Sequence, residues 1–260
     1  ILFNELTKKN GNLIFDSDLK NTQIFKKIAK RKKLNLFSIG HSDSSLKIIS
    51  TNTLNNFQHV KFSYQNKIYQ FKTNLIGKIQ IMNLMMAIAA AIQSNLKINK
   101  IVKKLQYVKP VTGRLEVIGK TKNNSIVILD YAHTPDALKI CIENIKEHYS
   151  SRKINIVFGC GGDRDEEKRQ IMGKIANKLC NFIYVTDDNP RTENPKKIRS
   201  SIKKSILPSK MIEIPSRKLA IRKAVLDSKS DDVLIIAGKG HETIQEYSKK
   251  KKFSDKDIIK

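Results

Sequence analysis

The hydrophobic pattern changes near residue 109, and the part before this point mixes strands with helices. Short apolar runs predict strands at 11–16, 34–39 and 46–50, and a strand pair within 60–71 that turns at Gln65-Asn66. Amphipathic spacing predicts a helix over 20–32, and an all-round apolar stretch predicts a buried helix over 81–93. The Lys109-Pro110 step interrupts the pattern, so we expect domains at 1–108 and 109–260.

After Pro110, strands and helices alternate regularly. Apolar runs of strand length occur at 126–130, 154–158, 182–186, 211–214 and 233–237, and helices are predicted over 135–149, 165–179, 195–206 and 217–227. This alternation predicts a parallel sheet with helices on both faces, which is a Rossmann-like, doubly wound α/β domain. Such sheets bind ligands in the loops that leave the carboxyl ends of their strands. Those loops are therefore the candidate site.

The charge of the chain is high but diffuse. The 260 residues contain 50 Lys+Arg and 24 Asp+Glu, which gives a formal net charge of +26. Such an excess favours a nucleic-acid partner because basic side chains neutralise phosphates. Here 41 of the basic residues are lysines, scattered in small groups, whereas specific contacts to bases favour arginine. Aromatic residues make up only 7% and Trp is absent, so few side chains are available to stack on bases. We expect no nucleic-acid partner and keep a basic nucleic-acid-binding protein as the less favoured alternative.

Several classes of protein are disfavoured by simple features of the sequence. No apolar run reaches the roughly 18 residues that span a bilayer, so we expect no membrane segment. The three cysteines lack CxxC spacing, which favours a reducing compartment, and hence the cytoplasm, over a disulfide framework or zinc site. Residues 1–12 do not read as a signal peptide. Because residue 1 is Ile, we expect the chain to begin inside a longer protein.

For three candidate residues in these loops, the residues alone favour a structural role over a functional one. Asp130 ends a predicted strand, where a carboxylate can accept hydrogen bonds from a ribose or, more commonly, anchor a neighbouring loop. His133 follows in the same loop and is interpreted as a hydrogen-bonded structural group rather than a general base. Cys160 stands among glycines without a neighbouring His, so we interpret it as a packing residue rather than a nucleophile.

The other three loops combine glycines with ionic side chains. They are Gly159-Cys-Gly-Gly-Asp-Arg-Asp165, Asp187-Asp-Asn-Pro-Arg191 and Gly238-Lys-Gly-His-Glu242. Arginine presents a fork that matches a carboxylate, while acidic and amide side chains can hold an ammonium, so the set suits an amino-acid ligand. The spacings match neither GxGxxG nor GxxxxGK[ST], and the latter occurs nowhere in the chain. We therefore predict neither a dinucleotide fingerprint nor a P-loop.

Together these motifs resemble the Mur ligases, and within that family the ligases that add meso-diaminopimelate to UDP-N-acetylmuramoyl-L-alanyl-D-glutamate. The resemblance covers 75–260 closely and 1–74 more loosely. It rests on Gly113-Arg-Leu-Glu116, Asp130-Tyr-Ala-His-Thr-Pro-Asp-Ala-Leu138, Phe158-Gly-Cys-Gly-Gly-Asp-Arg-Asp165, Thr186-Asp-Asp-Asn-Pro-Arg-Thr-Glu193 and Ala237-Gly-Lys-Gly-His-Glu242.

The resemblance implies a mixed α/β part of a central ATPase domain at 1–108, followed by an amino-acid-binding domain. It implies an ATP- and Mg²⁺-dependent ligase of peptidoglycan precursor synthesis that works through an acyl phosphate. The partners would be small molecules, namely UDP-MurNAc-dipeptide, meso-diaminopimelate and ATP, and the protein would be a monomer. The family's UDP-sugar domain and P-loop are missing, and the lysine it carbamylates to help hold magnesium would fall before Ile1. The chain alone is thus expected to be inactive, and the alternative is a non-catalytic amino-acid-binding remnant.

The resemblance also assigns site residues. The meso-diaminopimelate pocket would be formed by Arg164, Asp188, Asn189, Pro190, Arg191, Gly238 and Glu242. Arg191 would clamp the distal carboxylate that lysine lacks, and Glu242 with the Gly238 carbonyl would hold the distal ammonium. Nucleotide contacts would come from Arg114 to the phosphates, Asp130 to the ribose and Asn83 to the adenine. No catalytic residue and no metal ligand is assigned within the chain.

Overall fold

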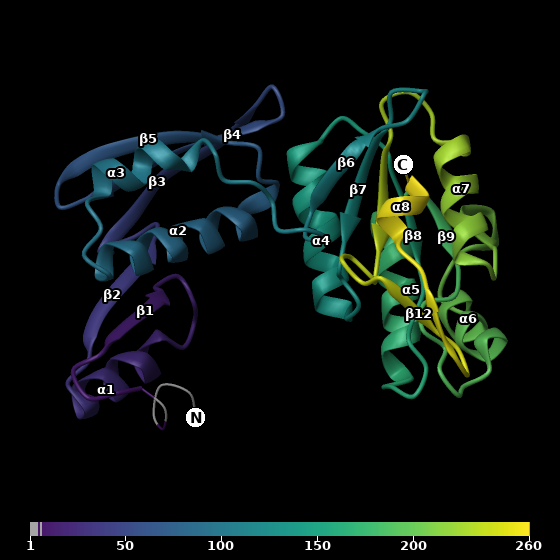
Figure 1. The fold of residues 1–260 in the computed structure, drawn as a ribbon, viewed down its shortest axis with the longest axis horizontal. Coiled ribbons are helices and arrows are strands. Elements are labelled where there is room, and N and C mark those ends of the chain that lie inside the picture. Colours follow the sequence, from purple (N-terminus) through teal and green to yellow (C-terminus); the bar gives the residue numbers. More distant parts are fainter. Residues whose placement is uncertain (1–4, 6, 260) are drawn as a thin grey trace. The chain divides into compact units, whose positions relative to one another are not determined.

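The protein divides into two compact units in the computed structural model, which describes residue 5 and residues 7–259 (Figure 1). Unit 1 is Ile1–Lys109 and unit 2 is Pro110–Lys260. Each unit has its own sheet and its own hydrophobic core.

Within its described residues, unit 1 contains a five-stranded mixed sheet and three α-helices. The sheet order is β1-β2-β3-β4-β5, in which the first three strands run parallel and the last three pair antiparallel. Its strands are β1 (Asn12–Asp16), β2 (Asn35–Gly40), β3 (Leu46–Leu54), β4 (Phe57–Tyr64) and β5 (Lys67–Thr73), and its helices are α1 (Thr22–Lys32), α2 (Gly77–Gln93) and α3 (Ile98–Leu105).

The core of unit 1 explains why α2 reads as apolar all round. Ile81, Met85 and Ile88 of this helix are buried against Val60 and Phe62 of the sheet. The predicted turn is also present, since Gln65 and Asn66 have φ values of 48° and 61°, as a type I′ hairpin turn requires. The predicted strands and helices of this unit are therefore confirmed.

Two features of unit 1 differ from the expectation. Helix α2 begins at Gly77 rather than at residue 81, and α3 was not predicted. The apolar residues of α3 do follow helical spacing, and Ile98, Ile101 and Val102 pack onto the core beside buried Leu105. The helix is only 8 residues long and its other face is polar and lysine-rich, so the apolar pattern is too short to predict a helix from the sequence.

Unit 2 is built on a six-stranded sheet in the order β10-β9-β8-β11-β7-β6. All neighbours are parallel except edge strand β6, which pairs antiparallel with β7. The strands are β6 (Glu116–Lys120), β7 (Ile126–Asp130), β8 (Ile154–Phe158), β9 (Phe182–Val185), β10 (Met211–Glu213) and β11 (Val233–Ala237). The main helices are α4 (Pro135–His148), α5 (Glu167–Leu179), α6 (Pro195–Lys203) and α7 (Arg217–Asp227).

Both faces of this sheet are covered, which confirms the doubly wound α/β prediction. On one face, Ala220 and Ile221 of α7 pack against sheet residues that include Leu129 and Leu234. Alternate residues such as Ile128 and Ile235 are fully buried on the opposite face. Since α7 covers the first face, we infer that helices α4, α5 and α6 cover this one. These three helices are consecutive and pack against one another.

The end of the chain adds small elements that were not predicted. A 3-10 turn spans Pro208–Lys210, and the last segment forms a hairpin of β12 (Ile244–Glu246) and β13 (Lys250–Lys252) followed by α8 (Asp255–Ile259). These pieces are three to five residues long and too short for a periodic signal. Among the described residues, no helix has the length and apolar character that crossing a bilayer requires.

Candidate amino-acid site

The four polar loops of unit 2 start at one edge of its sheet. Asp130 at the end of β7 is in register with Ala237 at the end of β11, and Phe158 of β8 is in register with Val185 of β9. Because these strands are parallel neighbours, the loops that follow them emerge side by side. The structure thus brings together motifs that lie up to about 110 residues apart in the sequence.

Glycines let the loop backbones approach closely. A Cβ at Gly162 would fall far inside van der Waals contact of the Pro190 carbonyl oxygen. Gly238 has a φ of 114°, and a Cβ there would lie 2.7 Å from Asp188 Oδ2. These two glycines are therefore required for the loops of β8, β9 and β11 to touch.

We expect Gly162→Ala to destabilise unit 2 by about 1–3 kcal/mol, since the added methyl group must push the Pro190 backbone away. Gly119→Ala is the matched control because nothing lies within 4 Å of a Cβ at that position in β6, and it should change stability by less than about 0.5 kcal/mol. Urea unfolding of the two variants provides the comparison. Equal stabilities would show that the loops do not pack as closely as described.

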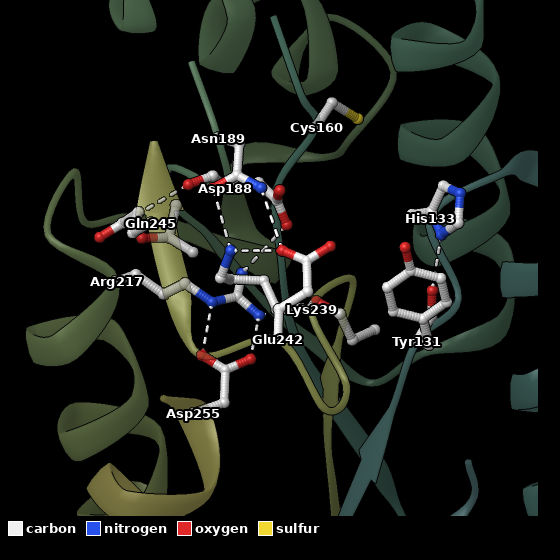
Figure 2. Close-up of polar contacts among 12 residues, drawn as sticks. Tyr131, His133, Cys160, Asp188, Asn189, Arg217, Lys239, Glu242, Gln245 and Asp255 are labelled. Carbon is white, nitrogen blue, oxygen red and sulfur yellow. Dashed lines mark hydrogen bonds and ion pairs between the residues drawn. The ribbon is translucent and has the colours of Figure 1, made fainter. Parts of the chain in front are cut away.

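A fully buried lysine lies between two of the predicted pocket residues. Lys239 is 0% exposed, and its Nζ donates to Asn189 Oδ1 at 2.9 Å and to Glu242 Oε2 at 2.8 Å. Asn189 Nδ2 also donates to Glu242 Oε2 at 3.1 Å (Figure 2). Burial would raise the pKa of Glu242, but the hydrogen bond and charge of Lys239 lower that pKa below its ordinary value. Glu242 is therefore held as an anion in a fixed position.

A second buried network supports the pocket loops after β9 and β11. The Arg217 side chain is 0% exposed and binds Asp255 through two hydrogen bonds of 2.8 and 2.6 Å, while it also donates to the Ala237 carbonyl at 2.9 Å (Figure 2). Its Nη1 lies 3.8 Å from Asp188 Oδ2, and within the described part of the chain neither atom has a hydrogen-bond partner. Burial raises the pKa of Asp188, and the nearby Arg217 and Lys239 oppose this.

Arg191 is held by two neighbouring segments, the loop after β8 and strand β12. Its Nη1 donates to the Gly162 carbonyl at 2.8 Å, its Nε lies 3.2 Å from Glu246 Oε2, and its backbone N–H donates to the Glu246 carbonyl at 3.0 Å. A Cβ on Gly161 would lie 2.9 Å from Arg191 Nη1 and 3.9 Å from Arg164 Cγ, so both arginines flank this glycine. Arg164 itself is exposed.

The predicted pocket residues therefore gather at one place. Asp188, Asn189 and Pro190 are buried, whereas Arg191 and Glu242 are partly exposed. The geometry presents a guanidinium and a carboxylate from loops that buried ion pairs hold in place. Such an arrangement can bind a ligand that carries both a carboxylate and an ammonium group.

Of the predicted nucleotide residues, Asp130 and Arg114 lie in unit 2 and Asn83 lies in unit 1. Asp130 uses its two oxygens to accept from the backbone N–H groups of Leu115, at 2.7 Å, and Ala132, at 2.8 Å, so it anchors a loop. The Arg114 guanidinium lies over the Tyr131 ring, 4.5 Å from its centroid. Asn83 is an exposed residue of α2 in unit 1. The nucleotide roles of these residues stay predictions.

Two residues take the structural roles that the sequence favoured. His133 is exposed, and its Nδ1 lies 2.8 Å from the Tyr131 carbonyl oxygen. Cys160 is buried with its Sγ 3.7 Å from Met172 Sδ, and burial raises the pKa of its thiol to about 12. A thiol that stays protonated is a poor nucleophile, so Cys160 belongs to the core.

Sequence reasoning missed the buried residues that hold the pocket, namely Arg217, Lys239, Gln245 and Asp255. Gln245 donates to the Asp188 carbonyl at 2.9 Å. A lysine between two glycines after a buried strand was a possible signal for Lys239. Arg217 and Asp255 are 38 residues apart, and nothing in the sequence connects them.

Comparisons with known proteins agree with this architecture. The protein-family model for the Mur ligase middle domain matches residues 1–91, and the one for the Mur ligase, glutamate ligase domain matches residues 113–240. The chain is 38% identical over 259 residues to the UDP-N-acetylmuramoyl-L-alanyl-D-glutamate--2,6-diaminopimelate ligase of Rickettsia bellii (strain RML369-C), covering 99% of this chain and 54% of that protein. It is 37% identical to the Chelativorans sp. (strain BNC1) ligase of the same name, covering 100% of this chain and 53% of that protein.

Solved structures give the same picture. A structure of a UDP-N-acetylmuramoyl-L-alanyl-D-glutamate--2,6-diaminopimelate ligase matches with a TM-score of 0.67 and 29% identity, over 96% of this chain and 52% of that one. The MurF ligase of Thermotoga maritima in complex with ADP has the same fold, with a TM-score of 0.67 and 16% identity, over 89% of this chain and 50% of that one. The chain spans about half the length of the curated relatives it matches. With a middle-domain match followed by a ligase-domain match, this chain belongs to the Mur ligase family.

Proposed function

We propose that unit 2 binds meso-diaminopimelate and that the chain is part of an ATP-dependent ligase that adds it to UDP-MurNAc-L-Ala-D-Glu. The main support is that loops at one edge of the sheet present both a guanidinium, Arg191, and a carboxylate, Glu242, which Lys239 holds in place. The names of the relatives that match the whole chain point to the same substrate. The enzyme would act in the cytoplasm, as a monomer, in peptidoglycan precursor synthesis.

Each end of the ligand has a proposed partner. Arg191 would bind the distal carboxylate, and Glu242 with the Gly238 carbonyl would bind the distal ammonium. Arg164, Asp188, Asn189 and Pro190 would complete the pocket. Lys239 keeps Glu242 ionised, which is the state that attracts an ammonium group.

The chemistry divides between the units. A carboxylate is a poor electrophile, so the D-glutamyl carboxylate would be activated by ATP as an acyl phosphate before the amine attacks. Unit 2 would hold the free amino group of meso-diaminopimelate in a fixed orientation for that attack, which lowers the entropic cost of the step. We propose that 1–108 is part of the ATPase domain and 109–260 the amino-acid domain, with Arg114, Asp130 and Asn83 as nucleotide contacts.

The described residues do not by themselves fit Mg²⁺. Within residues 5 and 7–259, no three His, Cys, Asp or Glu side chains form a group that could hold a metal ion. The chain also lacks a GxxxxGK[ST] loop. We therefore assign no magnesium ligand here and derive no step through the ion.

Calorimetric titration of the 260-residue chain tests the proposal. We expect meso-diaminopimelate to bind at least about tenfold more tightly than L-lysine, because lysine lacks the distal carboxylate that Arg191 would bind. Equal affinities, or no binding of either ligand, would contradict the assignment. Because no P-loop is present, we expect no phosphate release from ATP by the chain. Binding without turnover, both alone and in any longer form of the protein, would favour the alternative of a non-catalytic amino-acid-binding remnant.

A further inference from the structure

The hydrogen-bonding capacity of the Arg191 guanidinium is largely used within the protein. Its Nη1 donates to the Gly162 carbonyl at 2.8 Å and to the Asn189 carbonyl at 3.4 Å, and its Nε faces Glu246 Oε2 at 3.2 Å. A guanidinium has five N–H donors. Within the part of the chain that the structure describes, the Nη2 group of Arg191 makes no hydrogen bond, so its donors are available to a ligand.

A ligand carboxylate that binds through two hydrogen bonds needs two donors on one side of the guanidinium. The side formed by Nη1 and Nη2 is occupied at Nη1, which donates to the backbone carbonyls of Gly162 and Asn189. The side formed by Nε and Nη2 is blocked only at Nε, by the Glu246 carboxylate. A carboxylate of the protein thus occupies the position that a bidentate ligand carboxylate requires.

Glu246 can leave this position without moving its backbone. Its carbonyl accepts from the Arg191 N–H at 3.0 Å, and its N–H donates to Asn189 Oδ1 at 2.9 Å, so the backbone of β12 is fixed to the pocket loop. Its side chain is 32% exposed, whereas Arg191 is 25% exposed. Rotation of the Glu246 side chain into solvent would free Nε while Arg191 stays in place.

We propose that Glu246 determines the specificity of the Arg191 subsite by competing with the distal carboxylate of the amino-acid ligand. The inference rests on the proposed function. A diacid ligand must displace Glu246 from Arg191, so Glu246 weakens its binding. A ligand without the distal carboxylate, such as lysine, leaves the Arg191–Glu246 pair intact, so Arg191 is not left unpaired and lysine is rejected less strongly.

Glu246→Gln removes the competing charge and keeps the size of the side chain. Because the ion pair is partly exposed and therefore weak, we expect the variant to bind meso-diaminopimelate about three- to tenfold more tightly than the unaltered chain. The affinity for L-lysine should stay the same or fall, so the selectivity ratio widens. Glu143→Gln on α4 removes an equal charge from an exposed residue and should change neither affinity.

Titration calorimetry of the 260-residue chain and both variants with each of the two ligands gives the affinities to compare. If Glu246→Gln bound meso-diaminopimelate as tightly as, or more weakly than, the unaltered chain, Glu246 would not compete and the inference would be wrong. If no form of the chain bound meso-diaminopimelate while circular dichroism showed intact folds, the proposed function itself would fail. The ¹⁵N resonance of Arg191 Nε gives an independent readout, because ligand addition to the unaltered chain should change it as the ion pair with Glu246 is broken.

Discussion

Replacement of Arg217 by methionine is expected to destabilise unit 2 by about 3–5 kcal/mol, because it leaves a buried charge without its partner. Arg217 and Asp255 are both 0% exposed and joined by two hydrogen bonds, and Arg217 is also the nearest cation to buried Asp188. The variant would hold two carboxylates in the interior with no guanidinium beside them. We expect the tips of β9 and β11, and with them the pocket loops, to loosen first.

Lys223→Met on the same helix is the matched control. Lys223 pairs with Asp227 one turn away, but the two side chains are 51% and 36% exposed, so this pair should contribute less than about 1 kcal/mol. Hydrogen exchange at the amides of β11 reports on unit 2 alone, which avoids the mixed signal of a two-unit chain. If both variants lost the same protection, the Arg217–Asp255 pair would not stabilise the fold.

The central strands of unit 2 could be predicted to the residue, and the reason is burial. Strands β7 and β11 are covered on both faces, so every residue of Ile126–Asp130 and Val233–Ala237 is buried, and all but Asp130 are apolar. The edge strand β6 has no such run, because its residues are exposed or partly exposed. The hydrophobic pattern of the sequence thus predicts a strand more reliably the more completely the fold buries that strand.

The candidate site could be predicted as a set of loops but not as a network. Apolar runs that end in polar clusters marked the carboxyl ends of the strands, and the register of the sheet brings those ends together. The contacts that hold the loops are long-range hydrogen bonds of buried charged side chains. Lys239 with Asn189 and Arg217 with Asp255 join residues 50 and 38 positions apart. No local pattern encodes such pairs, because each partner alone reads as an ordinary polar or charged surface residue.

The contact between Arg191 and Glu246 shows the same limit at the most important residue of the site. The sequence identified Arg191 by its motif, but Glu246 lies in a three-residue strand with no pattern of its own. Only the geometry shows that Glu246 contacts this guanidinium. In the proposed competition, the affinity of the subsite for a ligand carboxylate is the strength of that carboxylate's contact with Arg191 less the strength of the Arg191–Glu246 contact that it replaces.

Arg191→Ala is therefore expected to act on one ligand and not on the other. Loss of a charge-assisted contact to a desolvated carboxylate costs about 2 kcal/mol or more, so meso-diaminopimelate should bind about 30-fold more weakly or worse. L-lysine has no distal carboxylate, and its affinity should change by less than about threefold. Arg191 has a φ of 54°, and alanine is no more strained there than arginine, so the substitution adds no new backbone cost.

Arg222→Ala, on the exposed side of α7, removes an equal charge outside the site and controls for the change in net charge. Calorimetry of both variants with both ligands separates the possible roles of Arg191. An equal loss of affinity for meso-diaminopimelate and L-lysine would mean that Arg191 supports the pocket as a whole, through its bonds to Gly162 and Asn189. A loss confined to meso-diaminopimelate would mean that the guanidinium reads the distal carboxylate, and in the complete ligase the same variant should raise the KM for this substrate far more than that for ATP.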